Sequence, residues 1–363
     1  MIESTELTPL PDRAASAGWQ RALLRLIEAV ITLGLALLVG AVVMELTGQD
    51  SLEAYRTLFT SAFGSRTAVA NTLLAATPLV FTGLGAAIAF RAGVFNVGVE
   101  GSLYLGAFVA AWAGFTFVSL HPVLTIGLAF LLALLVGGLW GYVPGVLKAR
   151  LGVDEIVTTI MLNYVAILFT SYLVNYPFRV PGVANAMSEP VVPGVELARL
   201  APPSQLNLSF VLAVLVTVAI FFIFRYTTLG YELRMVGDNF IFARWGGMPV
   251  AGVVEKVMFI SGALGGLAGA GQALGVHYRF VANFSPGFGF DGITVALLAA
   301  NHPLGTFFAA LLFGALRSGS ATMELFTDVP RDLIQVLEAT IIFFVATKFS
   351  VAWLWRRWRG TTG

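Results

Sequence analysis

Apolar runs of about 20 residues recur along the chain and alternate with shorter polar segments. A helix needs about 20 mostly apolar residues to cross a bilayer, so this pattern predicts about ten transmembrane helices. We place them at residues 23–46, 69–90, 96–118, 122–147, 155–177, 207–226, 256–276, 286–301, 303–320 and 332–352. The third and eighth runs are rich in Gly and interrupted by acids, which is typical of broken helices. The predicted fold class is therefore all-α, that of a polytopic integral membrane protein.

The segments between the apolar runs complete this topology. Residues 1–20 are polar and predict a cytoplasmic tail, followed by a single transmembrane domain at 21–363, with a short interfacial helix at about 55–63. With the N-terminus inside, most of the 21 Lys and Arg lie on the cytoplasmic side, although Arg317 is placed on the other side. The positive-inside rule then predicts that both termini are cytoplasmic. The Pro- and Gly-rich segment 179–206 lies outside the cytoplasm, either as a docking surface or as an ordinary linker.

Composition supports the membrane assignment and excludes several kinds of site. Hydrophobic residues make up 58% and charged residues 11% of the 363 positions. A soluble domain usually carries about 25% charged residues. The net charge of +1 argues against a nucleic-acid partner. The chain has no Cys, and its three His lie far apart, so we expect no metal site and no bound cofactor.

The stretch FRAGVFNVGVEGSLYLGAF, residues 90–108, places polar groups within an apolar region. Asn96 and Glu100 are the two groups concerned. A buried ionisable residue in a membrane protein usually faces a cavity or a partner, so we place both near a solute pathway. In a second interpretation, Glu100 starts a helix at the cytoplasmic surface, where the positive end of the helix dipole favours a carboxylate. One residue can fill both roles.

A second stretch, NFSPGFGFDGITVALLAANHPLG at 283–305, resembles the first in its pattern. Residues 98–101 and 289–292 each place an acid between glycines and are each followed by an apolar run. In the predicted topology the first lies near the inner face and the second near the outer face. Such a relationship is typical of an inverted-topology repeat, so we predict a 5+5 inverted repeat.

The polar segment RYTTLGYELRMVGDNFIFARWGGMPVAGVVEK, residues 225–256, lies on the predicted cytoplasmic side. Gly230 and Gly237 bracket one short helix, and residues 239–244 predict a second, which the glycines at 246–247 close. Most interhelical loops have about 2–8 residues, so a structured segment of this length favours docking of a soluble partner over an ordinary connection. The chain contains no G-x-x-x-x-G-K-[ST] motif, so we do not expect it to bind ATP through a Walker loop.

These stretches resemble the permease subunits of bacterial ABC importers for branched-chain amino acids, sugars and nucleosides. The resemblance lies in FRAGVFNVGVEG, GVDEIVTTIMLNYV (152–165), TTLGYELRMVGDNFIFARWGGM (227–248) and NHPLGTFFAALLFGALRSG (301–319). It extends over most of the chain from about residue 65, and it is nearest to nucleoside and simple-sugar permeases. It implies a location in the bacterial inner membrane. The implied partners are two ATP-binding cassette subunits, a second permease subunit that is a paralogue, and an extracytoplasmic substrate-binding protein.

The same resemblance implies that segment 225–256 is the coupling segment, which rests in a groove of the ATPase. Carried over by position, the residues of this contact are Leu229, Gly230, Arg234, Gly237, Asn239, Ala243 and Gly247. Two positions depart from the commonest form of the segment. Met235 stands where Ala is frequent, and Trp245 stands where a small or polar residue is usual.

The implied mechanism is alternating access, with ATP hydrolysed on separate subunits and a small polar solute moved into the cytoplasm. A nucleoside is the first expectation for this solute, and a simple sugar is the second. The residues that we expect nearest the pathway are Asn96, Glu100, Asn163, Gln272, Asn283, Phe284 and Asp291. Aromatic rings at Phe284, Phe288 and Phe290 would either face a base or sugar or pack against helices and lipid.

Two other classes of protein compete with this interpretation. In an ion-coupled secondary transporter, the acids Glu100, Asp291 and Glu338 would carry protons or sodium. Such a carrier has no need of a docking helix in segment 225–256. A membrane enzyme would need a catalytic constellation, and the sequence contains none that we can assign.

Overall fold

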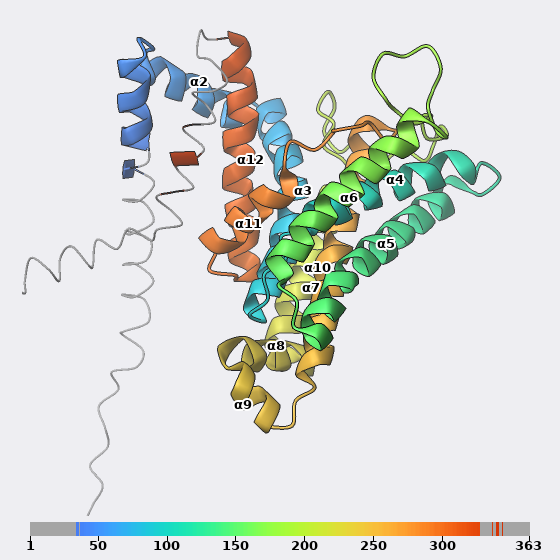
Figure 1. Ribbon diagram of the computed structural model, residues 1–363. Coiled ribbons are helices and arrows are strands. Elements are labelled where there is room, and N and C mark those ends of the chain that lie inside the picture. Colours follow the sequence, from blue (N-terminus) through green and yellow to red (C-terminus); the bar gives the residue numbers. More distant parts are fainter. Residues whose placement is uncertain (1–33, 36, 327–335, 337–338, 341–342, 344–363) are drawn as a thin grey trace, which may run out of the picture. The chain divides into compact units, whose positions relative to one another are not determined.

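A computed structural model describes residues 34–35, 37–326, 336, 339–340 and 343 (Figure 1). The chain forms two units, one of Met1–Leu52 with Asp328–Gly363 and the other of Glu53–Thr327. In the first unit, Leu37–Leu46 is a short apolar helix. The predicted tail and Glu338 lie outside the described residues, as do half of the first predicted span and most of the last one.

Regular structure in the described part of the chain is helical, apart from two isolated bridges between extended residues. The elements are α2 (Ser51–Phe63), α3 (Arg66–Arg91), α4 (Val99–Thr116), α5 (Pro122–Leu151), α6 (Glu155–Asn175), α7 (Leu208–Tyr226), α8 (Thr228–Asp238), α9 (Phe240–Trp245), α10 (Val250–Gln272), the π-helix η1 (Ala273–His277), α11 (Phe288–Leu298) and α12 (Pro303–Phe326). Among the described residues, six helices are long and apolar enough to cross a membrane: α3, α5, α6, α7, α10 continued by η1, and α12 up to Ala321. The all-helical membrane fold is thus confirmed, while the full set of ten spans and the 5+5 repeat stay predictions.

Helix ends follow capping signals that are legible in the sequence. The Ser65 side chain accepts a hydrogen bond from the backbone N–H of Ala68 and so caps α3. The Asp154 side chain caps α6 in the same way. The helix α5 ends at Leu151 and is followed by Gly152, whose φ of 67° is a left-handed conformation that Gly adopts readily.

The two runs predicted to be broken helices differ from each other. The third is one continuous helix, α4, which the non-helical residues 92–98 precede. The eighth contains α11, a helix of 11 residues, which follows the non-helical segment 278–287. At 1.5 Å per residue α11 is about 16 Å long, roughly half of a bilayer's hydrocarbon thickness. The eighth run therefore consists of a non-helical segment followed by a short helix.

The core lies around α3, α4 and α10. The most apolar part of α3 is 78% buried, against 22% for α6 and 28% for α5 and α7, so most of the apolar surface of those three helices points away from the core. Close approach of α5 and α10 depends on glycines: Gly137 and Gly141 of α5 face Gly262 and Gly266 of α10, and a Cβ at any of them would overlap the opposite backbone. This seam of small residues is the packing typical of membrane helices.

The two ends of the helical bundle carry different structures (Figure 1). The helices α8 and α9 form a hairpin at one end. At the other end, the connection between α6 and α7 is ordered without being helical, and it hydrogen-bonds to segment 278–287 through Ser188 and Val191.

Candidate functional site

Two Asn side chains hold the non-helical residues 92–98 where α4 begins. The Asn96 side chain is fully buried, and its Nδ2 donates to Ser261 Oγ in α10 at 2.8 Å. The Asn163 side chain, in α6, accepts from the Gly101 N–H at 2.7 Å and donates to a backbone carbonyl of residues 92–98 at 2.8 Å. Both amides are fixed by contacts within the protein, and these contacts position the start of α4.

Glu100, in the first turn of α4, meets the start of α11. Its carboxylate accepts a hydrogen bond from the Gly289 N–H, and the residue is only 2% exposed. A Cβ on Gly289 would overlap the backbone of Glu100, so the approach requires glycine. The N-termini of α4 and α11 thus lie together, and the dipoles of both helices favour a carboxylate between them.

This contact corrects one expectation from the sequence. Residues 98–101 and 289–292 were placed near opposite faces of the membrane, and that placement was wrong because Glu100 and Gly289 are hydrogen-bonded. The reason is the course of segment 278–287, which runs back along α4 before α11 begins. The Tyr104 hydroxyl lies 3.5 Å from the carbonyl oxygen of Ser285 in this segment.

An ion pair joins α11 to α12. Asp291 Oδ2 lies 2.9 Å from Arg317 Nη1, and the Arg317 guanidinium lies 4.7 Å above the Phe288 ring. The two side chains are 33% and 26% exposed, so the pair is open on one side. Arg317 was expected on the extracytoplasmic side, near the end of the span predicted at 303–320, whereas α12 continues past it to Phe326. The single Arg within an apolar run was the available signal for this missed partner.

The aromatic residues of this region divide into packed and open rings. The Phe284 ring centroid lies 5.0 Å from that of Tyr104 and 5.7 Å from that of Phe280, so Phe284 belongs to an aromatic cluster with α4. Phe288 is buried beneath Arg317. Phe290 is 46% exposed and leaves an aromatic surface open.

The residues predicted to lie near the pathway also differ in exposure. Four of them are buried, namely Asn96, Glu100, Asn163 and Gln272. Asn283 is exposed, with a φ of 55°, and Asp291 is partly exposed. Asn283 and Asp291 are thus accessible, while the other four polar side chains are enclosed by the protein.

The hairpin of α8 and α9 is firmly attached to the bundle. The Arg234 side chain turns inward and donates to the Phe224 carbonyl in α7. A Cβ on Gly230 would overlap the backbone of Phe224, and a Cβ on Gly237 would overlap the carbonyl of Arg91 at the end of α3. These contacts fasten α8 to both α3 and α7.

The remaining residues predicted for the coupling contact shape the hairpin itself. Leu229 is half-buried and Ala243 is fully buried. Asn239 Oδ1 accepts from the Phe242 N–H at 2.9 Å and so caps α9. Gly247, with a φ of 80°, lets the chain turn after α9. The two short helices predicted within residues 225–256 are confirmed as α8 and α9.

Large apolar side chains cover the outward side of the hairpin. This hairpin surface consists of Tyr231, Phe240, Ile241, Phe242 and Trp245, which are 51–87% exposed. An exposed apolar patch of this kind marks an interaction site. Sequence reasoning missed four of these residues, because an apolar residue in a short amphipathic helix is expected to face the core.

The described residues contain no group of three or more His, Cys, Asp or Glu that could hold a metal ion. The polar groups that the structure does bring together are a buried carboxylate, an ion pair and several amides. These groups can bind and orient an uncharged polar molecule, but they do not form a nucleophile with an adjacent base.

Comparison with known proteins shows the family to which this chain belongs. A family model described as the permease component of branched-chain amino acid transport systems matches residues 68–346. The chain belongs to this permease family. The permease is 37% identical over 335 residues to the guanosine ABC transporter permease protein NupP of Bacillus subtilis, an alignment that covers 90% of this chain and 94% of the relative.

Two further relatives cover most of the permease. The nucleoside ABC transporter permease protein NupB of Lactococcus lactis is 32% identical over 340 residues, which is 90% of this chain and 92% of the relative. The glucose ABC transporter permease protein TsgB13 of Haloferax volcanii is 33% identical over 330 residues, which is 88% of this chain and 86% of the relative.

Membership of the family settles the class of protein. The chain is a multi-pass membrane protein and the permease subunit of an ABC transporter, hence a transport component rather than an enzyme. A permease of this family works with ATPase and binding-protein partners. The ion-coupled carrier is accordingly set aside.

Proposed function

We propose that this permease moves a nucleoside into the cytoplasm as the membrane subunit of an ABC importer. Two relatives support this solute class, since one is named for guanosine and the other for nucleosides. A simple sugar is the second candidate, because a glucose permease is similarly related. Both solutes are uncharged and polar, so hydrogen bonds and aromatic faces suit them better than salt bridges.

The proposed assembly lies in the bacterial inner membrane. It contains two ATP-binding cassette subunits, a second permease subunit that is a paralogue, and an extracytoplasmic substrate-binding protein. The tail 1–20 precedes a single permease domain at 21–363, both termini and segment 225–256 face the cytoplasm, and segment 179–206 faces the binding protein. The position of the hairpin and of the α6–α7 connection at opposite ends of the bundle supports this orientation (Figure 1).

The observation that carries the proposed mechanism is the hairpin of α8 and α9, which exposes apolar side chains outward while its inner side is fixed to the bundle. We propose that the hairpin surface rests in a groove of the ATPase. Closure of the ATPase dimer on ATP would then displace α8, and α8 would displace α3 and α7 with it. The non-helical residues 92–98 follow α3 directly, so the displacement reaches the start of α4.

The proposed solute pathway runs past the start of α11. Asp291 and Arg317 form a partly exposed ion pair within apolar helices, and such groups in a membrane protein face water or a partner rather than lipid. Phe290, next to Asp291 in α11, adds an open ring, and we propose that the exposed Asn283 adds a hydrogen-bonding group. Behind this surface, we propose that the buried residues Asn96, Glu100, Asn163 and Gln272, together with the part-buried Phe284, support the break between helices.

Two matched substitutions test the docking role of the hairpin. Phe242 in the hairpin and Phe308 in α12 are exposed to similar extents, 62% and 66%. A buried aromatic anchor at a protein interface contributes about 2 kcal/mol or more. We therefore expect Phe242→Ala to reduce the ATPase that co-purifies with the tagged permease by about ten-fold or more, and Phe308→Ala to leave it unchanged. Equal recovery of ATPase with both variants would rule out docking through this surface.

The solute is tested separately, in proteoliposomes that contain the whole transporter and its binding protein. We expect ATP-dependent uptake of labelled guanosine or another nucleoside, with competition by unlabelled nucleosides and not by glucose. If unlabelled glucose reduced uptake and unlabelled nucleosides did not, the transported solute would be a simple sugar. Nucleoside uptake that persists without ATP would contradict the proposed importer.

A further inference from the structure

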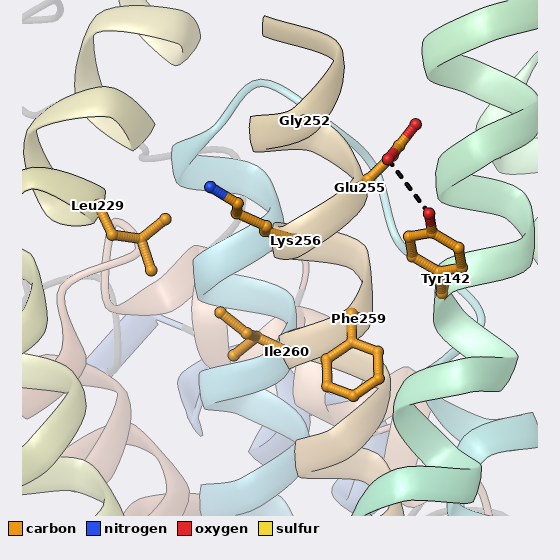
Figure 2. Close-up of a pocket in the computed structure, with 7 residues that line it drawn as sticks. All are labelled: Tyr142, Leu229, Gly252, Glu255, Lys256, Phe259 and Ile260. Carbon is orange, nitrogen blue, oxygen red and sulfur yellow. Dashed lines mark hydrogen bonds between the residues drawn. The ribbon is translucent and has the colours of Figure 1, made fainter. Parts of the chain in front are cut away.

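A shallow pocket of about 370 Å³ opens where α10 passes α5 and α8 (Figure 2). Its lining residues are Tyr142, Leu229, Gly252, Glu255, Lys256, Phe259 and Ile260. Leu229 belongs to the hairpin, so one wall of the pocket is the element that we propose couples to the ATPase. The pocket lies away from the Asp291–Arg317 ion pair and has no part in the proposed solute pathway.

The pocket retains a positive charge. Glu255 is already neutralised, because its Oε1 lies 2.7 Å from Arg150 Nε and its Oε2 accepts from the Tyr142 hydroxyl at 3.2 Å. Figure 2 shows Glu255 directed toward Tyr142, whereas Lys256 extends on the other side toward Leu229. Lys256 takes part in none of the ion pairs formed within the described residues. The ammonium group is therefore available to an anion that enters the pocket.

The position of Lys256 along its helix indicates the kind of anion. Lys256 lies in the second turn of the membrane-crossing stretch Val250–His277, about 9 Å from its start. A Lys near the end of a transmembrane helix extends its charge to the headgroup region while its stem stays among apolar groups. Phe259 and Ile260 lie one turn deeper and give the pocket an apolar wall. A ligand whose phosphate contacts Lys256 and whose acyl chain contacts Phe259 and Ile260 fits this arrangement of a charged and two apolar side chains.

We propose that the pocket binds one anionic phospholipid per permease chain, with the headgroup phosphate on Lys256 and the start of an acyl chain along Phe259 and Ile260. Basic pockets between transmembrane helices on the cytoplasmic side are typical places for such headgroups. The bound lipid fills the space between Leu229 of α8 and α10. It thereby braces the hairpin against α10.

Native mass spectrometry of the detergent-purified transporter tests the proposal, with phosphatidylglycerol and phosphatidylcholine of equal chain length as the probes. A Lys near the membrane surface contributes about 1 kcal/mol toward an anionic lipid, which corresponds to about five-fold in affinity. We expect phosphatidylglycerol to bind about five-fold more tightly than phosphatidylcholine. Lys256→Met should abolish this preference, and Lys256→Arg should keep it. Arg244→Met, which removes an exposed charge of α9 outside the pocket, should also keep it.

Three outcomes would overturn the proposal. An unchanged preference in Lys256→Met would show that the pocket does not select the lipid. An equal loss in Arg244→Met would show a general effect of surface charge. Displacement of the lipid by millimolar glycerol 3-phosphate, which has the phosphate but no acyl chains, would show that the site takes a free phosphate compound.

Discussion

Replacement of Gly237 by Ala tests whether the hairpin transmits movement to the bundle. Gly237 is next to last in α8, and the carbonyl carbon of Arg91 would lie 2.9 Å from an added Cβ, with the carbonyl oxygen closer still. Because the obstacle is backbone, no rotamer change relieves the overlap, and α8 has to move away from the end of α3. The substitution therefore acts on the contact through which α8 displaces α3.

The expected magnitude follows from two opposing effects. Overpacking by a methyl group costs about 1–3 kcal/mol. Ala also favours a helix over Gly by about 1 kcal/mol, so the net loss of stability is small and the permease should still insert and fold. The overpacking cost arises only when α8 lies against the end of α3, whereas the helix propensity of Ala is the same whether or not the two helices touch. A bias of about 1–3 kcal/mol lowers the population of that arrangement by about 5- to 150-fold.

The assay compares solute uptake with ATP hydrolysis in proteoliposomes that contain the complete transporter. We expect Gly237→Ala to lower uptake by at least about five-fold while hydrolysis continues, since the ATPase still closes but α3 no longer follows. Gly127→Ala in α5 is the matched control, because no atom lies within 4 Å of a Cβ at that position. Uptake by Gly237→Ala equal to that of the control would refute the proposed transmission.

Two further substitutions address the region around the start of α11. Asn163→Ala leaves the buried Gly101 N–H and the part-buried carbonyl of Val97 unpaired, which should cost about 1–3 kcal/mol and lower the thermal unfolding midpoint of the detergent-purified protein. Asn175→Ala, which loses only bonds within its own helix, should have little effect, and equal midpoints would contradict the assigned role. For the ion pair, Asp291→Asn and Arg317→Met should each lower uptake. The loss in the double variant should be smaller than the sum of the two single losses, by about 1–3 kcal/mol when the losses are expressed as free energies. Strictly additive losses would show that the pair does not act as a unit.

Local features of the fold could be predicted from the sequence. Apolar runs predicted the long helices, and the glycines at 230, 237 and 246–247 predicted two short helices that the structure has as α8 and α9. The acid and glycines of the eighth run predicted a break, which appears as the short helix α11. Each of these signals depends on residues within a few positions of one another. Propensity and capping act over the same distance, so the sequence displays them directly.

The partners of polar side chains could not be predicted in the same way. Asn96, Asn163 and Asn283 are alike as isolated polar residues among apolar neighbours. The first two are buried in bonds to distant segments, while the third is exposed. Arg317 likewise finds Asp291 only once α11 and α12 are folded together. Which polar group meets which depends on packing between elements far apart in the chain, and no local pattern records that.

The glycines between α5 and α10 also limit the ways in which this transporter can change shape. At Gly137 and Gly266 the two backbones touch without side chains between them. Separation of the helices would lose the close van der Waals contact that these glycines permit between the two backbones. We therefore expect α5 and α10 to move together during the transport cycle. In that case the other helices would open and close the pathway, with α5 and α10 as the frame against which they move.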